Sequence, residues 1–182
     1  STAGGHDAAR PAAAILVPVA TMPILEDPEG HETAALARLV PSFAGRRVLE
    51  IGCGDGRLTR RYAASAASVM AIDPNESIVK PAFVFSIDRP AKLLDLLPKA
   101  DVVVLACPLT AETKGMFGAA QFKAMKESAY LINIARGGLV QQDALLDALK
   151  TRTIAGAGLD VTDPEPLPDA HPLWKQPNVV IS

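Results

Sequence analysis

A glycine-rich turn is the first stretch of this chain whose residue types suggest chemistry. Gly52, Gly54 and Gly56 follow the apolar run 48–51 at alternate positions. Glycine adopts positive φ and has no Cβ, so such a turn lets the backbone approach a ligand closely. A strand, a glycine-rich turn and a helix start, in this order, are typical of nucleotide-cofactor loops. We therefore expect these three glycines to bind a cofactor; the alternative is a glycine-rich strand-to-helix turn without a ligand.

The carboxylates around this turn narrow the class of ligand. Glu50 lies in the apolar run, Asp55 in the turn, and Asp73 at the end of a second apolar run. Asp73 lies about 20 residues past the first glycine, where a βαβ unit places the acid that binds a ribose. A pyrophosphate would be repelled by these acids, whereas a sulfonium and an ammonium would not. The third glycine of the fingerprint G-x-G-x-x-G would fall at Arg57, whose side chain we expect to point away.

These residues resemble the S-adenosylmethionine-dependent methyltransferases. The sequence VLEIGCGDG (48–56) is similar to the first motif of that family, and AID (71–73) is similar to the strand whose acid holds the ribose. The resemblance implies S-adenosylmethionine or S-adenosylhomocysteine as the ligand, with Glu50 and Asp73 among the contacts. NAD(P) is the less favoured cofactor.

The second half of the chain carries several linked motifs of a different family. From about residue 81 to residue 182 it resembles the NAD(P)-binding domain of D-2-hydroxyacid dehydrogenases of the glyoxylate/hydroxypyruvate reductase type. The motifs occur in the family's order: ADVVVLACPLT (100–110), LINIARGG (131–138), AGAGLDV (155–161), DPEP (163–166) and HPLW (171–174).

The dehydrogenase resemblance implies roles for particular residues. Arg136 would bind the substrate carboxylate, Glu165 would pair with a catalytic histidine, and Asp160 would contact the nicotinamide side. The cofactor would be lined by three residues after the strand at 101–106, namely Cys107, Pro108 and Thr110. From the residues alone, Arg136 is equally consistent with a strand-end arginine paired with a carboxylate, and Glu165 with a turn acid between prolines.

The family's general acid/base is a histidine just beyond the strand that here ends at Ile181 and Ser182. The histidines of this sequence are His6, His31 and His171, and none follows that strand. The resemblance therefore implies that Arg136 and Glu165 are vestigial, and we expect no turnover. Positioned proton transfer contributes about 10²–10⁴ in rate.

Alternating apolar runs and helical patterns predict an α/β fold, a doubly wound, Rossmann-like three-layer sandwich around a mainly parallel sheet. The strand at 48–51 should pair parallel with the one at 101–106, in the order 3-2-1-4-5-6 with one further strand. Helices are expected after Asp27, after the glycine turn, and over 93–97, 122–126 and 141–150. The strands are expected at 48–51, 68–72, 83–86, 101–106, 129–134, 154–161 and 178–181.

Composition excludes several classes of protein. A length of 182 residues predicts one domain, 1–182, whose segment 1–11 is small and polar like a processed or added end. A net charge of −2 argues against nucleic-acid and anionic-membrane partners. No apolar run is long enough to span a bilayer, and we expect no signal peptide. The two cysteines fit no metal or disulfide pattern, so the default location is cytoplasmic. Cys53 and Cys107 should be reduced and accessible at the mouth of the crevice.

Together these patterns favour a recombined or engineered chimera. Its methyltransferase-like part would cover residues 12–79 and its dehydrogenase-like part 80–182, with a seam between about Ser77 and Phe83. Such a chain would be a folded scaffold that binds a small nucleotide cofactor weakly at most. The alternatives are a dehydrogenase fragment with a drifted glycine loop, and a methyltransferase. The sequence does not indicate an oligomeric state.

Overall fold

The computed structural model describes residues 42–75, 80 and 82–182. The helix expected after Asp27, the segment 1–11 and most of the expected seam lie outside the described residues.

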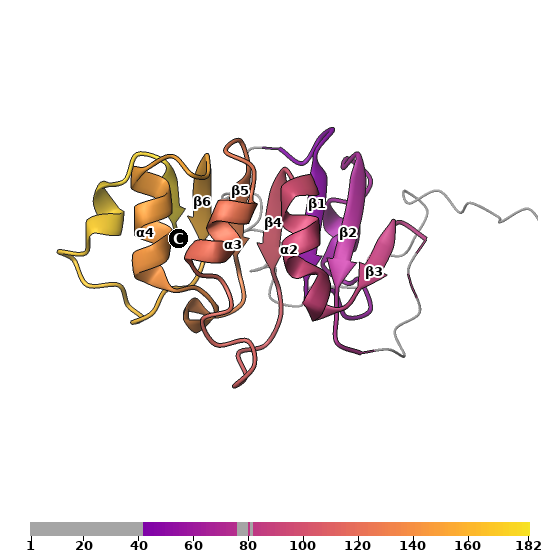
Figure 1. The fold of residues 1–182 in the computed structure, drawn as a ribbon, viewed down its shortest axis with the longest axis horizontal. Coiled ribbons are helices and arrows are strands. Elements are labelled where there is room, and N and C mark those ends of the chain that lie inside the picture. The colour runs from indigo at the N-terminus through magenta and orange to yellow at the C-terminus, as the bar shows by residue number, and fades with distance from the viewer. Residues whose placement is uncertain (1–41, 76–79, 81) are drawn as a thin grey trace, which may run out of the picture.

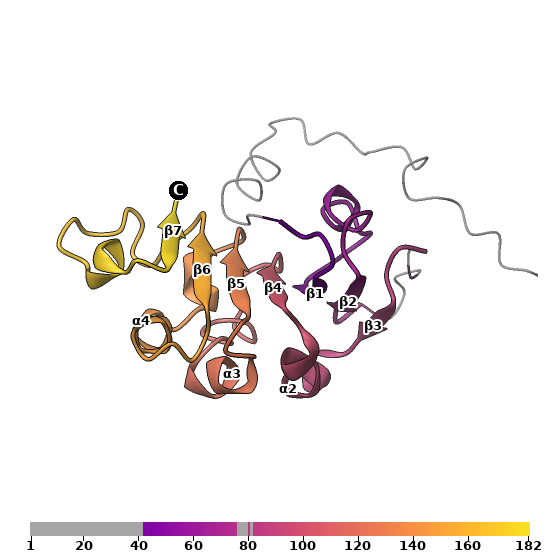
Figure 2. The same ribbon diagram turned by 90° about the horizontal axis from the view of Figure 1, so that it is seen from above.

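The described residues form a seven-stranded sheet in the order β3-β2-β1-β4-β5-β6-β7 (Figures 1 and 2). All neighbouring strands are parallel, and β1 pairs with β4 from Val48↔Val102 to Ile51↔Leu105. This confirms the predicted doubly wound α/β fold and its strand order. The strands are β1 (Arg47–Ile51), β2 (Ser68–Ile72), β3 (Ser86–Asp88), β4 (Val102–Leu105), β5 (Tyr130–Asn133), β6 (Gly156–Leu159) and β7 (Val179–Ile181).

Helices cover one face of this sheet. Figure 2 shows α2 (Leu93–Leu96), α3 (Ala119–Ala124) and α4 (Gln142–Lys150) on the same side. The turn that follows β1 lies on the other side. Short 3-10 turns complete the described elements: η2 (Thr59–Arg61), η3 (Pro90–Lys92), η4 (Leu97–Lys99), η5 (Gly137–Leu139) and η6 (Pro172–Lys175).

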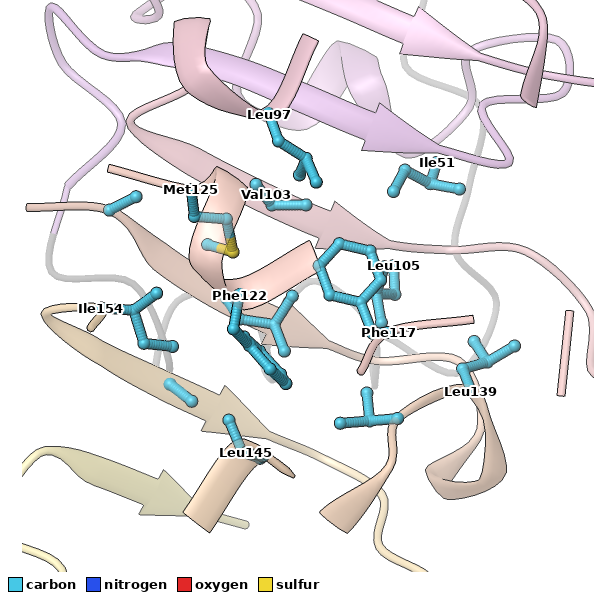
Figure 3. Close-up of a cluster of buried hydrophobic side chains, with 14 of the residues drawn as sticks. Ile51, Leu97, Val103, Leu105, Phe117, Phe122, Met125, Leu139, Leu145 and Ile154 are labelled. Atoms are coloured by element: carbon cyan, nitrogen blue, oxygen red, sulfur yellow. The ribbon is translucent and has the colours of Figure 1, made fainter. Parts of the chain in front are cut away.

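Side chains of the central strands alternate between two hydrophobic clusters. Leu49 and Ile51 of β1 pack in the cluster under the helices, while Val48 packs in the cluster on the opposite face. The buried residues of the first cluster converge from β1, β4, β5 and the helices (Figure 3). A strand buried on both faces needs a continuous apolar run, which explains the Val-rich sequence of β4. The same alternation places Glu50 on the face of Val48, away from the helices.

The helix expected after the glycine turn is the main local difference. The chain forms only η2 and a turn up to residue 66. Two backbone bonds end it there: the Gly45 amide donates to the Ser65 carbonyl over 3.1 Å, and the Ala67 amide donates to Arg46 over 2.9 Å. These contacts return the chain to the start of β1 after one turn. Elsewhere β3 begins three residues later than predicted, because Val84 is buried in a small cluster with Cys53 and Ala71 before pairing with β2 begins.

A carboxylate with two cationic partners fixes the amino-terminal edge of the sheet. Asp101, just before β4, accepts hydrogen bonds from the Arg47 amide and guanidinium at 2.9–3.2 Å and pairs with the Lys126 ammonium. These partners hold the pKa of Asp101 well below its usual value, although partial burial opposes the shift. Asp101, Arg47 and Lys126 therefore form an ionic cluster at the start of β1 and β4.

Within the described part of the chain, no helix is long and apolar enough to cross a membrane. The same residues contain no group of three or more His, Cys, Asp or Glu that could hold a metal ion.

Candidate cofactor-binding site

A crevice of about 700 Å³ opens where β1, β4 and β5 end. Its walls come from the loops that follow these strands, residues 52–58 without Gly56, 106–109 and 134–136, and from Glu50. Ligands of doubly wound sheets bind at the carboxyl ends of the strands, beside the point where the strand order reverses. The crevice lies at that point, between β1 and β4.

The glycine turn forms the floor of this crevice. Gly52, Gly54 and Gly56 all adopt positive φ, at 88°, 51° and 81°. A Cβ on Gly52 would lie 2.5 Å from the Cα of Cys107, so the loops after β1 and β4 touch through a position that only glycine fills. Around Gly54, by contrast, nothing lies within 4 Å of such a Cβ, so there is open space beside this position of the turn. Gly56 shapes the turn but does not line the crevice.

Asp73 supports the glycine turn. Its carboxylate accepts a hydrogen bond from the Gly54 amide at 3.0 Å and another from the Asn75 amide at 2.9 Å. It is not among the described residues that line the crevice. The ribose-binding role of Asp73 stays a prediction, and its observed contacts hold the loop in shape.

Glu50 is a buried carboxyl group in the wall of the crevice. Its Oε2 accepts hydrogen bonds from the Thr59 hydroxyl and, at 2.6 Å, from the Tyr62 hydroxyl. Burial raises the pKa of Glu50 to about 7, although these hydrogen bonds and the charge of Arg57 oppose the shift. Its Oε1 is buried and has no hydrogen-bond partner among the described residues. One oxygen of this carboxyl group is therefore satisfied, and the other is buried without a partner among the described residues.

The charges around the crevice are more balanced than the sequence suggested. Arg57 lines the crevice, so the expectation that it points away is wrong. Arg136 lines it as well, as does Asp55. With the pKa of Glu50 raised to about 7, Asp73 outside the lining and two arginines within it, the crevice does not present the set of three carboxylates on which the expected repulsion depended.

The thiols differ from expectation. Cys53 and Cys107 are reduced and both line the crevice, but their side chains are buried. Burial raises the pKa of Cys53 to about 12 and also raises the pKa of Cys107. The expectation of accessible thiols is wrong, because Cys107 packs closely against Gly52 and Cys53 is buried in the small cluster with Ala71 and Val84.

Asn133 positions the third wall and was missed at the level of sequence. This buried residue ends β5; its amide group donates to the Arg136 carbonyl at 2.9 Å and accepts from the Ala135 amide at 3.1 Å. Arg136 is exposed, and its guanidinium donates to the Ala135 carbonyl at 2.6 Å. A buried polar residue at the end of an apolar run was the available signal for such a support.

The remaining predicted residues lie apart from this crevice or at its margin. Pro108 lines it, but Thr110 is exposed in a turn that it forms with Glu112 and Thr113. Asp160 and Glu165 line a second cavity of about 320 Å³ near Trp174. Arg136 and Glu165 therefore do not share a cavity, and their catalytic roles stay predictions.

His171 has a structural set of contacts. Its Nδ1 accepts a hydrogen bond from the Leu173 amide at 3.2 Å, and its Nε2 lies 3.1 Å from the side-chain nitrogen of Gln142. It caps η6, as expected for a residue of a loop motif.

Known proteins similar to this chain point to one family. A profile described as the D-isomer specific 2-hydroxyacid dehydrogenase, NAD binding domain, matches residues 29–182. A glycerate dehydrogenase from Methylorubrum extorquens is 43% identical over 127 residues, which are 69% of this chain and 37% of that protein. The human glyoxylate reductase/hydroxypyruvate reductase is 51% identical over 87 residues, 48% of this chain and 26% of that protein. The chain thus spans between a quarter and two fifths of the length of these relatives.

A solved structure agrees with the profile. The D-isomer specific 2-hydroxyacid dehydrogenase from Xanthobacter autotrophicus, in complex with NADPH and MES, superposes with a TM-score of 0.68 at 33% identity. The similarity covers 75% of this chain and 56% of the other.

These findings correct the expected cofactor. The matched domain is an NAD binding domain and the superposed structure holds NADPH, so the assignment of S-adenosylmethionine or S-adenosylhomocysteine is wrong. The physical reason is that Glu50 is buried and its pKa is raised to about 7, so the repulsion expected from a full charge at this position is weaker. The profile also spans the expected seam between Ser77 and Phe83, so it treats both sides of that seam as one domain.

Proposed function

Because this chain belongs to the D-isomer specific 2-hydroxyacid dehydrogenases through their NAD binding domain, we propose that its crevice binds NAD or NADP. We propose further that the chain is the cofactor-binding part of an enzyme of the glyoxylate/hydroxypyruvate reductase type, which the human relative supports. The observation that carries the proposal is the crevice at the ends of β1, β4 and β5, floored by the glycine turn. Residues 42–182 would act as one Rossmann-like domain toward this small-molecule partner.

The residues of the crevice fit a dinucleotide. Gly54 has no Cβ and lines the crevice, so a ligand can approach the turn closely there, and Arg57 and Arg136 add positive charge to the lining. The buried Oε1 of Glu50 offers an unused hydrogen-bonding position in the wall. Leu109 and Ile134 add apolar surface for a ring. The volume of the crevice lies in the range of small-molecule and cofactor sites.

The chain's own residues would bind and orient the reactants. When bound, NAD(P) supplies the hydride acceptor or donor for the hydroxyl-bearing carbon of a 2-hydroxy acid. Arg136 would hold the substrate carboxylate, because its guanidinium is exposed at the crevice and anchored on the Ala135 carbonyl. A guanidinium presents several donors in a plane, which suits a carboxylate. Asn133 keeps this wall in place.

Titration calorimetry with NAD, NADH, NADP and NADPH tests the proposal, with S-adenosylmethionine as the comparison ligand. We expect a dinucleotide to bind and to raise the thermal midpoint, since a ligand at a hundredfold excess over its Kd stabilises a protein by about 2.7 kcal/mol. Asp55→Asn removes a negative charge from the crevice wall and should tighten binding severalfold at low salt. Asp147→Asn, on the exposed side of α4, makes the same change in charge elsewhere and should leave the Kd unchanged. Failure of all four dinucleotides to bind would overturn the proposal.

A further inference from the structure

We infer that dinucleotide binding in the crevice is coupled to the uptake of a proton by Glu50, whose Oε1–H then donates a hydrogen bond to the bound cofactor. This inference rests on the proposed function and adds to it a residue that sets the pH range of cofactor binding.

The position of Glu50 supplies the geometric basis. The side chain lines the crevice, yet it is 0% exposed, because the turn that follows β1 covers it. Thr59 and Tyr62 both donate to Oε2, and Oε1 has no partner among the described residues. A buried polar atom without a partner is unfavourable, and a ligand that pairs with it removes that cost.

The chemistry of the ligand decides which protonation state pairs. The phosphate and hydroxyl oxygens of a dinucleotide are mainly hydrogen-bond acceptors, and its phosphates are negative. An ionised Oε1 would repel them, whereas a protonated Oε1 is a donor. Because the Thr59 and Tyr62 hydroxyls both donate to Oε2, we place the proton on Oε1, which has no partner among the described residues.

Among the ionisable groups that surround it, Glu50 is the one whose protonation changes near neutral pH. Arg57 favours its charged form and Asp73 disfavours it, while burial raises the pKa of Glu50 to about 7. Cys53 and Tyr62, which face it from the turn, keep their own protons at this pH because burial raises the pKa of each well above neutrality. Cys107, across from it on β4's loop, also has a raised pKa. A negative ligand beside Glu50 raises its pKa further, which is equivalent to proton uptake on binding.

Calorimetric titration with NADH in buffers of different ionisation enthalpy measures this uptake directly. We expect close to one proton bound per NADH at about pH 8 and almost none at about pH 5.5, where Glu50 is already protonated. The apparent Kd should correspondingly rise about tenfold between pH 6 and pH 8. Glu50→Gln should bind NADH with no proton uptake and a Kd that does not change over this range.

Tyr62→Phe provides a second variant that retains the aromatic ring stacked on Phe43. Loss of its hydroxyl removes a hydrogen bond to the charged carboxylate, so the rise in proton uptake should move to higher pH by about one unit. A role of Tyr62 in packing alone would leave the midpoint in place.

Binding of NADH without proton uptake at pH 8, or the same uptake in Glu50→Gln, would overturn the inference. If Glu50→Gln does not fold, an unmoved midpoint in Tyr62→Phe overturns it. If no dinucleotide binds to the wild type, the proposed function fails, and this inference fails with it.

Discussion

One carboxyl group lies where the parallel strands begin and another lies where they end, and the two have opposite environments. At the amino-terminal edge, Asp101 has a backbone amide, a guanidinium and an ammonium as partners, and its pKa is lowered. At the carboxyl-terminal edge, one oxygen of Glu50 has two hydroxyl partners and the other has none among the described residues, and burial raises the pKa of Glu50.

This contrast separates stability from binding. Asp101 uses its hydrogen-bonding capacity within the protein, which joins the starts of β1 and β4. Glu50 keeps part of its capacity unused at a crevice, and perturbed carboxyl groups in such positions are typical of functional sites. The polar groups that the protein leaves unpaired therefore indicate which edge meets the ligand.

The largest effect is expected from Gly52→Ala at the binding edge. The new Cβ would meet the backbone of Cys107 at 2.5 Å and the residue would have to keep φ near 88°. Positive φ costs about 1–2 kcal/mol and overpacking a further 1–3 kcal/mol, so urea unfolding should show a loss of about 3 kcal/mol. Gly45→Ala has a φ of 68° but open space around it, and should lose only the first part. Equal losses in the two variants would show that the crevice floor is not tightly packed.

An effect of similar or smaller size is expected from Glu50→Gln, and it should depend on pH. An acid whose pKa is raised on folding stabilises least when ionised, so stability should fall as the pH rises from about 4.5, the unfolded value, through about 7. At pH 8 the Gln variant should exceed the wild type by at most roughly 3 kcal/mol, and the advantage should vanish near pH 4.5. Unfolding curves at both pH values measure this. If the free energy of unfolding of the wild type is constant over this range, Glu50 and Asp101 do not differ in the way described above.

Asp101→Asn should have the smallest effect and the opposite pH dependence. Because the pKa of Asp101 is lowered on folding, its contribution is complete above the unfolded value near 3.9 and disappears as the pH falls toward the folded value. Arg47 is half exposed, so solvent screening limits the loss at pH 7 to about 1 kcal/mol. The difference between variant and wild type should shrink below about pH 4, as measured by urea unfolding. A difference that grows in acid would contradict the assignment.

The sequence by itself determined most of the fold. The continuous apolar run of β4 and the alternation of strands with helical patterns predicted a parallel sheet with β1 beside β4, because a strand buried on both faces tolerates few polar residues. Gly52 was identified correctly as a position that needs glycine, although its contact with Cys107 joins residues 55 positions apart and is visible only in the structure. The linked motifs of the second half also indicated the right family.

Only the tertiary structure decided the electrostatics of the site. From the sequence, Glu50, Asp55 and Asp73 counted as three full negative charges, and this count led to the wrong cofactor. In the fold, burial raises the pKa of Glu50 although Thr59 and Tyr62 donate hydrogen bonds to it. Backbone amides bind Asp73, and Arg57 lines the crevice. A charge depends on burial and on partners that come from other parts of the chain. Spacing along the sequence fixes which residues meet at the crevice, but not which of them remain charged there.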